Sequence, residues 1–537
     1  MSSHQPSATT TCPEEPATSS EGLHRGLGNR HLQLIAIGGA IGTGLFMGSG
    51  KTISLAGPSI LLVYAIIGTV LFFVMRAMGE LLLSNLNYKS FRDIAEDILG
   101  PWAGFFAGWT YWFCWIVIGI ADLTAVTSYV QFWWPDVPKW LPATCLVLLL
   151  LGLNLIAVRL FGEIEFWFAM IKIVAIIALI VVAVVLIVSG FISPEGHRAT
   201  LANLYNDGGF FPTGGQGFLA GFQIAFFAFV GIELVGTAAA ETKDPVRTLP
   251  KAINAIPVRV MLFYVCALTA IMSVTPWRSI NPSVSPFVSM FSLAGFGAAA
   301  SVVNFVVLTS AASSANSGMF STSRMLYGLS LDRKAPVAFG RLTSHGVPAK
   351  GLVFSCSCLL PGLVLLYVSD SIVGAFTLAT TVASVLFIFV WGVIMVCYLV
   401  YRRRSPELHE ASPYKMPLGI PLTYVVLVFF VAMIVVLAFE PDTRAALMAT
   451  PVWFVLLGIL YLLHRRSHRG ALPEPEPAGS GHPLEVALVA EGAGLAEAEP
   501  VVDDGPTTGT AAVVEAETVV EVQAVIEAAR NQSARST

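Results

Sequence analysis

Long apolar runs alternate with short polar connections along most of this chain. A helix needs about 20 predominantly apolar residues to cross a bilayer, and runs of roughly this length recur from residue 31 onward. The twelve runs lie at 31–50, 57–83, 103–132, 139–159, 163–190, 216–240, 256–276, 296–322, 350–368, 372–401, 418–438 and 448–464. This pattern predicts an all-α polytopic membrane protein with twelve transmembrane helices.

Composition supports this interpretation, because 55% of the residues are hydrophobic and only 12% are charged. Soluble domains are about a quarter charged. The ends of the chain differ from the core: residues 1–22 are rich in Ser, Thr and Pro, and residues 467–537 are rich in Glu, Ala and Val. We therefore predict disordered tails at 1–22 and 467–537, the second one acidic, around a membrane domain at 23–466.

Basic residues indicate the orientation of the helices. About twenty Lys and Arg lie in the N-terminal segment, the even-numbered connections and the segment after the last run, whereas about five lie in the odd-numbered connections. An excess of Lys and Arg is typical of cytoplasmic loops. We expect a multi-pass protein of the cytoplasmic (inner) membrane with both termini in the cytoplasm.

The first apolar run contains GGAIGTGLF (residues 38–46), with four glycines among residues 38–44. Gly in a helix interior is about 1 kcal/mol less favourable than Ala, so this cluster favours a break in the helix. The alternative is close helix packing, because Gly38 and Gly42, or Gly44 and Gly48, form small-residue faces.

The sixth run contains FAFVGIELVG (residues 227–236), in which Glu233 follows Gly231. An acidic side chain at the centre of a membrane helix costs roughly 2.5 to 3.5 kcal/mol to insert, so this segment also needs compensation. Interrupted segments five helices apart are typical of inverted-repeat transporters. We therefore predict a five-plus-five inverted repeat with helices 1 and 6 unwound at the midplane. Alternatively, Glu233 braces the turn without taking part in transport.

Unwound segments leave backbone groups of both polarities inside the membrane, and a free amino acid satisfies both. The N–H groups expected to bind its carboxylate belong to Gly42, Thr43 and Gly44. The carbonyls expected to accept from its ammonium belong to Ala40, Ile41, Phe227 and Ala228. The two broken segments together thus predict a binding site for a small zwitterion.

Lys172 is a single ammonium within the fifth run, and the apolar residues 166–171 separate it from Glu165. Desolvation disfavours the charged form of a buried lysine, so the side chain can alternate between two charge states. Lys172 and Glu233 are therefore the candidates for proton coupling. The alternative for Lys172 is snorkelling to the interface. Side chains of the eighth run that could face its end of the cavity are Ser313, Ser314 and Asn316.

Three further charged groups lie within the second and third runs. Arg76 and Glu80 stand four residues apart, which predicts an i,i+4 ion pair. Asp122 has no partner that the sequence assigns. The cysteines lack the spacing of a disulfide framework or a zinc site, so we expect no bound metal.

Several stretches of the chain resemble the bacterial amino acid permeases of the amino acid–polyamine–organocation superfamily. They are LIAIGGAIGTGLFMGSGK, RAMGELL, FAFVGIELVGTAAAETKDP and SRMLYGL, and the resemblance runs from about residue 23 to about residue 466. Others are most similar to family members that carry small neutral amino acids: GKTISLAGPSI, GPWAGFFAGWTYWFCW, FGEIEFWFAMIKIVAII and VVNFVVLTSAASSANSG.

The resemblance implies roles for individual residues. Thr43 and its flanking glycines would bind the substrate carboxylate, Phe227 would act as a gate, and Lys172 would occupy the position where sodium-coupled relatives hold an ion. Trp115, next to Cys114, would fill side-chain space and keep the pocket small. The full candidate substrate set is Ala40, Ile41, Gly42, Thr43, Gly44, Cys114, Trp115, Phe227, Ala228, Phe229 and Gly231.

The function implied is proton-coupled import of D-serine, D-alanine and glycine by alternating access. The expected partners are a small zwitterionic amino acid, a proton and the lipid bilayer, with no nucleic acid. No cofactor is expected beyond the proton gradient, and a monomer suffices for transport, although the oligomeric state stays open. The alternatives are a permease of the same family for 4-aminobutyrate, proline or an aromatic amino acid, or an amino-acid sensor. An enzyme is not expected, because no catalytic constellation is present in the sequence.

Overall fold

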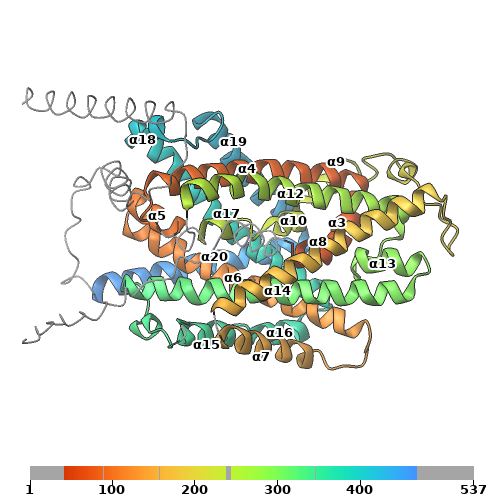
Figure 1. The fold of residues 1–537 in the computed structure, drawn as a ribbon, viewed down its shortest axis with the longest axis horizontal. Helices are drawn as coiled ribbons and strands as arrows, with labels where there is room; N and C mark the ends of the chain where they lie inside the picture. The colour runs from red at the N-terminus through yellow and green to blue at the C-terminus, as the bar shows by residue number, and fades with distance from the viewer. Residues whose placement is uncertain (1–40, 89, 157, 238–243, 345, 468–537) are drawn as a thin grey trace, which may run out of the picture. The chain divides into compact units, whose positions relative to one another are not determined.

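The computed structural model describes residues 41–88, 90–156, 158–237, 244–344 and 346–467 (Figure 1). Within these ranges the fold is helical, and the only β pairing is an isolated bridge between Ile192 and Arg198. Ten segments are long and apolar enough to cross a membrane. The predicted class, an all-helical polytopic membrane protein, is confirmed. Residues 31–40 of the first expected run, the tail at 1–22 and nearly all of the tail at 467–537 lie outside the described residues.

The helices follow one another in chain order. The first part contains α2 (Thr43–Phe46), α3 (Gly48–Ala56), α4 (Ile60–Ser84), α5 (Phe91–Leu99), α6 (Pro101–Gln131), α7 (Trp140–Ile156) and α8 (Val158–Val188). The second contains α9 (Gly214–Ala220), α10 (Phe222–Ala225), α11 (Leu234–Thr237), α12 (Pro245–Val274), α13 (Pro286–Leu293) and α14 (Gly297–Leu331). The third contains α15 (Ala349–Ser357), α16 (Pro361–Val368), α17 (Ile372–Arg404), α18 (Pro406–Ala411), α19 (Ile420–Phe439) and α20 (Pro441–Ser467).

Some helices extend beyond the apolar runs that predict them. α12 begins at Pro245, whereas the run begins at residue 256, because the Asp244 side chain accepts a hydrogen bond from the Arg247 N–H and Pro245 occupies the first helical position. α14 likewise continues to Leu331. The short helix α5 lies between two runs and starts with a capping box formed by Ser90 and Asp93. Hydropathy alone does not detect these polar helical ends.

α6 is the central helix of the packing, and it is buried over most of its length. It packs against α14 and α17, while α4 and α12 run alongside one another (Figure 1). α19 and α20 are mostly exposed and strongly apolar, as a lipid-facing helix should be. α6 is therefore an inner helix of the bundle, whereas α19 and α20 lie at its periphery.

Two places depart from regular helix. Ile41 and Gly42 are non-helical, and α2 starts at Thr43 after an extended Gly42 (φ −129°). In the sixth run, α10 is followed by a 3₁₀ turn, η3 (Phe227–Phe229), and the chain is non-helical from Val230 to Glu233 before α11 begins. Gly231 has φ +104°, in the left-handed region that favours glycine.

Candidate substrate and proton site

The two interrupted segments touch each other at Gly44. A Cβ atom added to Gly44 would lie 2.5 Å from Ala228 Cα and 2.9 Å from Ala228 N, so α2 and η3 meet backbone to backbone. Gly48 is similarly close to Ile224, whose Cγ2 would lie 2.5 Å from an added Cβ. Glycine at these positions is required by the close approach of the two segments.

The expected ammonium-binding carbonyls already accept hydrogen bonds within the protein. Ser310 Oγ donates to Ile41 O over 3.1 Å, and Tyr264 Oη donates to Ala228 O over 2.7 Å. The Val230 N–H donates to Phe227 O over 3.0 Å. Each carbonyl has a second lone pair, so these bonds orient the oxygens without excluding a further donor. Ala40 lies outside the described residues.

Thr43 connects the first interrupted segment to α6. Its Oγ1 donates a 2.7 Å hydrogen bond to Asp122 Oδ1, and both residues are buried. Ser314 of α14 and Lys172 of α8 also interact with this carboxyl. Asp122, which has no assigned role in the sequence-based set, thus contacts the residue expected to bind the substrate carboxylate.

Lys172 lies deep inside the protein, with 1% of its surface exposed, so the snorkelling alternative is wrong. Its Nζ donates to Ser313 Oγ over 3.0 Å, and Ser313 Oγ donates to Glu165 Oε1 over 2.9 Å. Lys172 interacts electrostatically with both Glu165 and Asp122. The expectation that residues 166–171 separate Lys172 from Glu165 is also wrong, because positions seven apart lie on one face of a helix. That spacing was visible in the sequence.

Glu233 stabilises the non-helical turn that precedes it. Its Oε2 accepts a 3.0 Å hydrogen bond from the Gly231 N–H, and Tyr111 Oη donates to its Oε1 over 3.5 Å. The side chain is fully buried. This geometry matches a carboxyl that braces the turn, and it leaves the role of Glu233 in proton coupling a prediction.

Aromatic side chains surround the interrupted segments. The ring of Trp115 is buried and lies over Gly318 of α14, where an added Cβ would be 2.7 Å from Trp115 Cε3. Phe227 makes an edge contact with Phe376 at a centroid distance of 6.1 Å, and Phe229 packs on Tyr264 at 5.2 Å.

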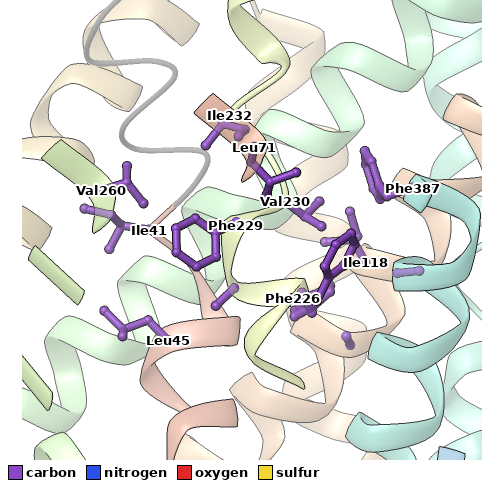
Figure 2. Close-up of a cluster of buried hydrophobic side chains, with 14 of the residues drawn as sticks. Ile41, Leu45, Leu71, Ile118, Phe226, Phe229, Val230, Ile232, Val260 and Phe387 are labelled. Atoms are coloured by element: carbon purple, nitrogen blue, oxygen red, sulfur yellow. The ribbon is translucent and has the colours of Figure 1, made fainter. Parts of the chain in front are cut away.

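The interrupted segments also share a buried apolar cluster. Figure 2 shows Ile41 and Leu45 of the first segment in one cluster with Phe229, Val230 and Ile232 of the second. Cys114 is buried in the same core. Polar groups of the two segments are therefore shielded from water.

The chain matches the family model described as amino acid permease over residues 31–473. It is 64% identical over 449 residues to a D-serine/D-alanine/glycine transporter of Escherichia coli (strain K12), which covers 84% of this chain and 96% of the relative. It is also 54% identical over 448 residues to the amino-acid permease AapA of Bacillus subtilis (strain 168), covering 83% and 96%. The chain belongs to the amino acid permease family. The matched family and these relatives are transporters rather than enzymes.

The permease has a second buried charged cluster, at the end of α4. Glu80 accepts from Tyr398 Oη over 3.1 Å and from the Met416 N–H over 2.7 Å, and its Oε1 lies 2.5 Å from His409 Nδ1. Arg76 instead donates to Asn254 Oδ1 over 2.9 Å. The expected Arg76–Glu80 pair is therefore wrong, because other parts of the chain supply partners to each side chain.

Tyr414 covers the Arg76 side of this cluster in the permease. The Arg76 guanidinium lies 3.9 Å from the centre of the Tyr414 ring, and Tyr414 Oη donates to Asn254 Oδ1 over 2.9 Å. Burial raises the pKa of the Tyr414 phenol to about 12, so the phenol is a protonated donor at neutral pH. The connection that follows α18 is thus held against α4 and α12.

Proposed function

We propose that this permease imports D-serine, D-alanine and glycine together with protons across the cytoplasmic membrane, by alternating access. The 64% identity to a transporter of these amino acids supports the substrate class. The contact of α2 with η3 at Gly44 is the observation that carries the proposal, because it brings backbone groups of two interrupted segments together in buried surroundings. A zwitterion bound there would satisfy donors and acceptors that water does not reach.

The proposed architecture has twelve transmembrane helices in a five-plus-five inverted repeat, with helices 1 and 6 unwound at the midplane. The non-helical stretch from Val230 to Glu233 and the start of α2 at Thr43 support this arrangement. The transporter domain spans 23–466, flanked by cytoplasmic tails at 1–22 and 467–537. The basic residues support this orientation by the positive-inside rule. A monomer suffices, and the proton gradient replaces any cofactor.

Lys172, or a group coupled to it, is the proposed carrier of the transported proton. Its ammonium is buried and interacts electrostatically with the carboxyls of Glu165 and Asp122, so its charge state affects the stability of the surrounding helices. Trp115 limits the pocket to amino acids with small side chains. A methyl or hydroxymethyl group is then accepted in either configuration at the substrate Cα. Phe227 closes over the substrate.

The test is uptake of labelled glycine, D-alanine and D-serine into proteoliposomes, with and without an inward proton gradient. We expect the gradient to stimulate wild-type uptake of all three. Lys172→Ala should lose the stimulation while retaining exchange of internal for external substrate, because binding survives and coupling does not. Lys350→Ala, which removes an exposed ammonium, is the matched control and should behave as wild type.

Different results separate the parts of the proposal. Uptake that is indifferent to the gradient in the wild type would contradict proton coupling. Exchange lost together with accumulation in Lys172→Ala would assign Lys172 to substrate binding or folding instead. Uptake of none of the three amino acids would favour a family member with another substrate, and binding without uptake would favour a sensor.

A further inference from the structure

We propose that Asp122 takes up the co-transported proton and that the Thr43 hydroxyl passes this change to the substrate carboxylate. The proposal rests on the function proposed above, in which Thr43 binds that carboxylate. It makes Asp122 a positioning residue, because Asp122 acts on the substrate through Thr43.

The hydrogen of the Thr43 hydroxyl is the group that changes direction. Thr43 Oγ1 donates it to Asp122 Oδ1 over 2.7 Å. A hydroxyl has one hydrogen, so Thr43 cannot donate to a second carboxylate while this bond exists. An ionised carboxylate can only accept, and it therefore fixes the hydroxyl in this direction. The incoming substrate carboxylate then meets the lone pairs of Thr43 instead of its hydrogen.

A proton on Asp122 reverses this hydrogen bond. The carboxylic acid O–H donates to Thr43 Oγ1, and the Thr43 hydrogen turns toward the substrate carboxylate. One proton leaves the solution and joins one carboxylate oxygen, and no covalent bond in the substrate changes. The proton also removes a negative charge beside the substrate, where two carboxylates sharing one hydroxyl would repel each other.

The neighbours of Asp122 allow this change of charge. Lys172 of α8 interacts with Asp122 and with Glu165, so the ammonium keeps a buried carboxyl partner when Asp122 becomes neutral. The other groups facing Asp122 are Ser314 of α14 and Tyr129 of α6. Among the described neighbours, the hydroxyl donors can rotate to follow the change.

Glu233, the other candidate, is placed differently. One of its oxygens accepts the Gly231 N–H, which cannot rotate away, and the bond closes the turn before α11. A proton on Glu233 would therefore act on the turn, whereas a proton on Asp122 acts on a side chain that donates to the substrate.

The test is equilibrium binding of labelled glycine to the purified full-length protein, from about pH 5 to about pH 8. In the wild type, Kd should rise about tenfold for each pH unit over which the free protein loses the coupled proton. Asp122→Asn carries a neutral donor in place of the carboxylic acid, so its Kd should stay low and become independent of pH. Asp122→Glu should restore the pH dependence, and Asp370→Asn, which changes an exposed carboxyl, should leave it unaltered.

Three outcomes would overturn the relay. The first is an Asp122→Asn protein whose Kd follows pH as in the wild type. The second is an Asp122→Asn protein that loses the same amount of affinity at every pH, as expected if Asp122 were a permanent ligand of the substrate ammonium. The third is wild-type binding that does not change with pH. In contrast, a wild type that binds no glycine at any pH contradicts the proposed function itself.

Infrared difference spectra give a second readout that needs no variant, in case Asp122→Asn does not fold. Asp122 is the only buried aspartate among the described residues. Glycine binding should therefore produce the carbonyl band of a protonated carboxyl group that shifts in protein labelled with ¹³C-aspartate. A band that shifts only with ¹³C-glutamate would assign the proton to one of the buried glutamates, Glu80, Glu165 or Glu233, and overturn the proposal.

Discussion

Two buried networks of charged side chains hold this permease together in different ways. In the network at the end of α4, the Glu80 carboxylate binds a backbone N–H, a phenol and an imidazole at once. In the interior network, hydroxyls link the charged groups: Thr43 donates to Asp122, and Ser313 connects Lys172 to Glu165.

The difference lies in which donors can move. A backbone N–H held in a folded connection has one direction, whereas a hydroxyl hydrogen rotates about its C–O bond to suit its acceptor. The α4 network therefore fixes a connection, and the interior network can change its hydrogen bonds when a charge changes. We expect substitutions in the first to affect mainly stability, and substitutions in the second to affect mainly transport.

The largest expected effect on transport is that of Gly44→Ala. The added Cβ would lie 2.5 Å from Ala228 Cα, a backbone atom that cannot yield without separating α2 from η3. Thr43 would then move away from Asp122. We expect glycine uptake to be abolished, while the free energy of unfolding falls by roughly 1 to 3 kcal/mol, the range for overpacking.

Proteoliposome uptake measures the loss of transport, and thermal melts of the same preparation measure the loss of stability. Gly152→Ala is the matched control, because no atom lies within 4 Å of a Cβ added there, and its uptake should be normal. A Gly44→Ala protein with wild-type uptake would show that the contact of the two segments is not needed for transport.

Glu80→Ala should instead lower stability and leave transport by the folded protein unchanged. It removes a fully buried carboxyl and leaves the buried Met416 N–H without its acceptor, so we expect a loss of roughly 3 to 5 kcal/mol in stability. The molecules that remain folded should keep the wild-type ratio of gradient-driven uptake to exchange. Glu407→Ala, on the exposed surface of α18, should change neither quantity. A stable Glu80→Ala protein with lost coupling would remove the distinction between the networks.

The sequence predicts some of these features because their signals are local. Apolar runs mark the membrane helices, and the glycines near Thr43 and the acid at Glu233 mark places where a regular helix is unfavourable. The bond between Thr43 and Asp122 has no such signal, because it joins residues of two helices 79 positions apart. Only packing brings them together.

Two errors in the expectations have physical reasons. Arg76 and Glu80 have the spacing of an ion pair, yet the connection after α18 supplies other partners. The Met416 N–H binds Glu80, and the Tyr414 ring packs against the Arg76 guanidinium. Lys172 and Glu165 are seven positions apart in the chain, and two helical turns bring both side chains to the same face of the helix. Periodicity could have predicted the second contact, whereas the first depends on how a polar connection folds.

The smallest expected effect belongs to Tyr414→Phe, at the edge of the α4 network. This substitution removes the hydrogen bond to Asn254 and keeps the ring beneath the Arg76 guanidinium. Asn254 is exposed, and its Oδ1 still accepts from Arg76, so the acceptor keeps a partner. We expect a loss of about 1 kcal/mol at neutral pH, measured by thermal melts, and unchanged transport.

The pH dependence of that loss identifies its source. Burial raises the pKa of Tyr414 from 10.0 to about 12, so the folded state binds the phenol proton more tightly than the unfolded state does. The stability gained from this proton is complete below pH 10 and disappears as the pH rises through about 12. The difference in stability between the wild type and Tyr414→Phe should therefore shrink over this interval, since other titrating groups contribute equally to both proteins. A constant difference would mean that the phenol is not desolvated in the folded state.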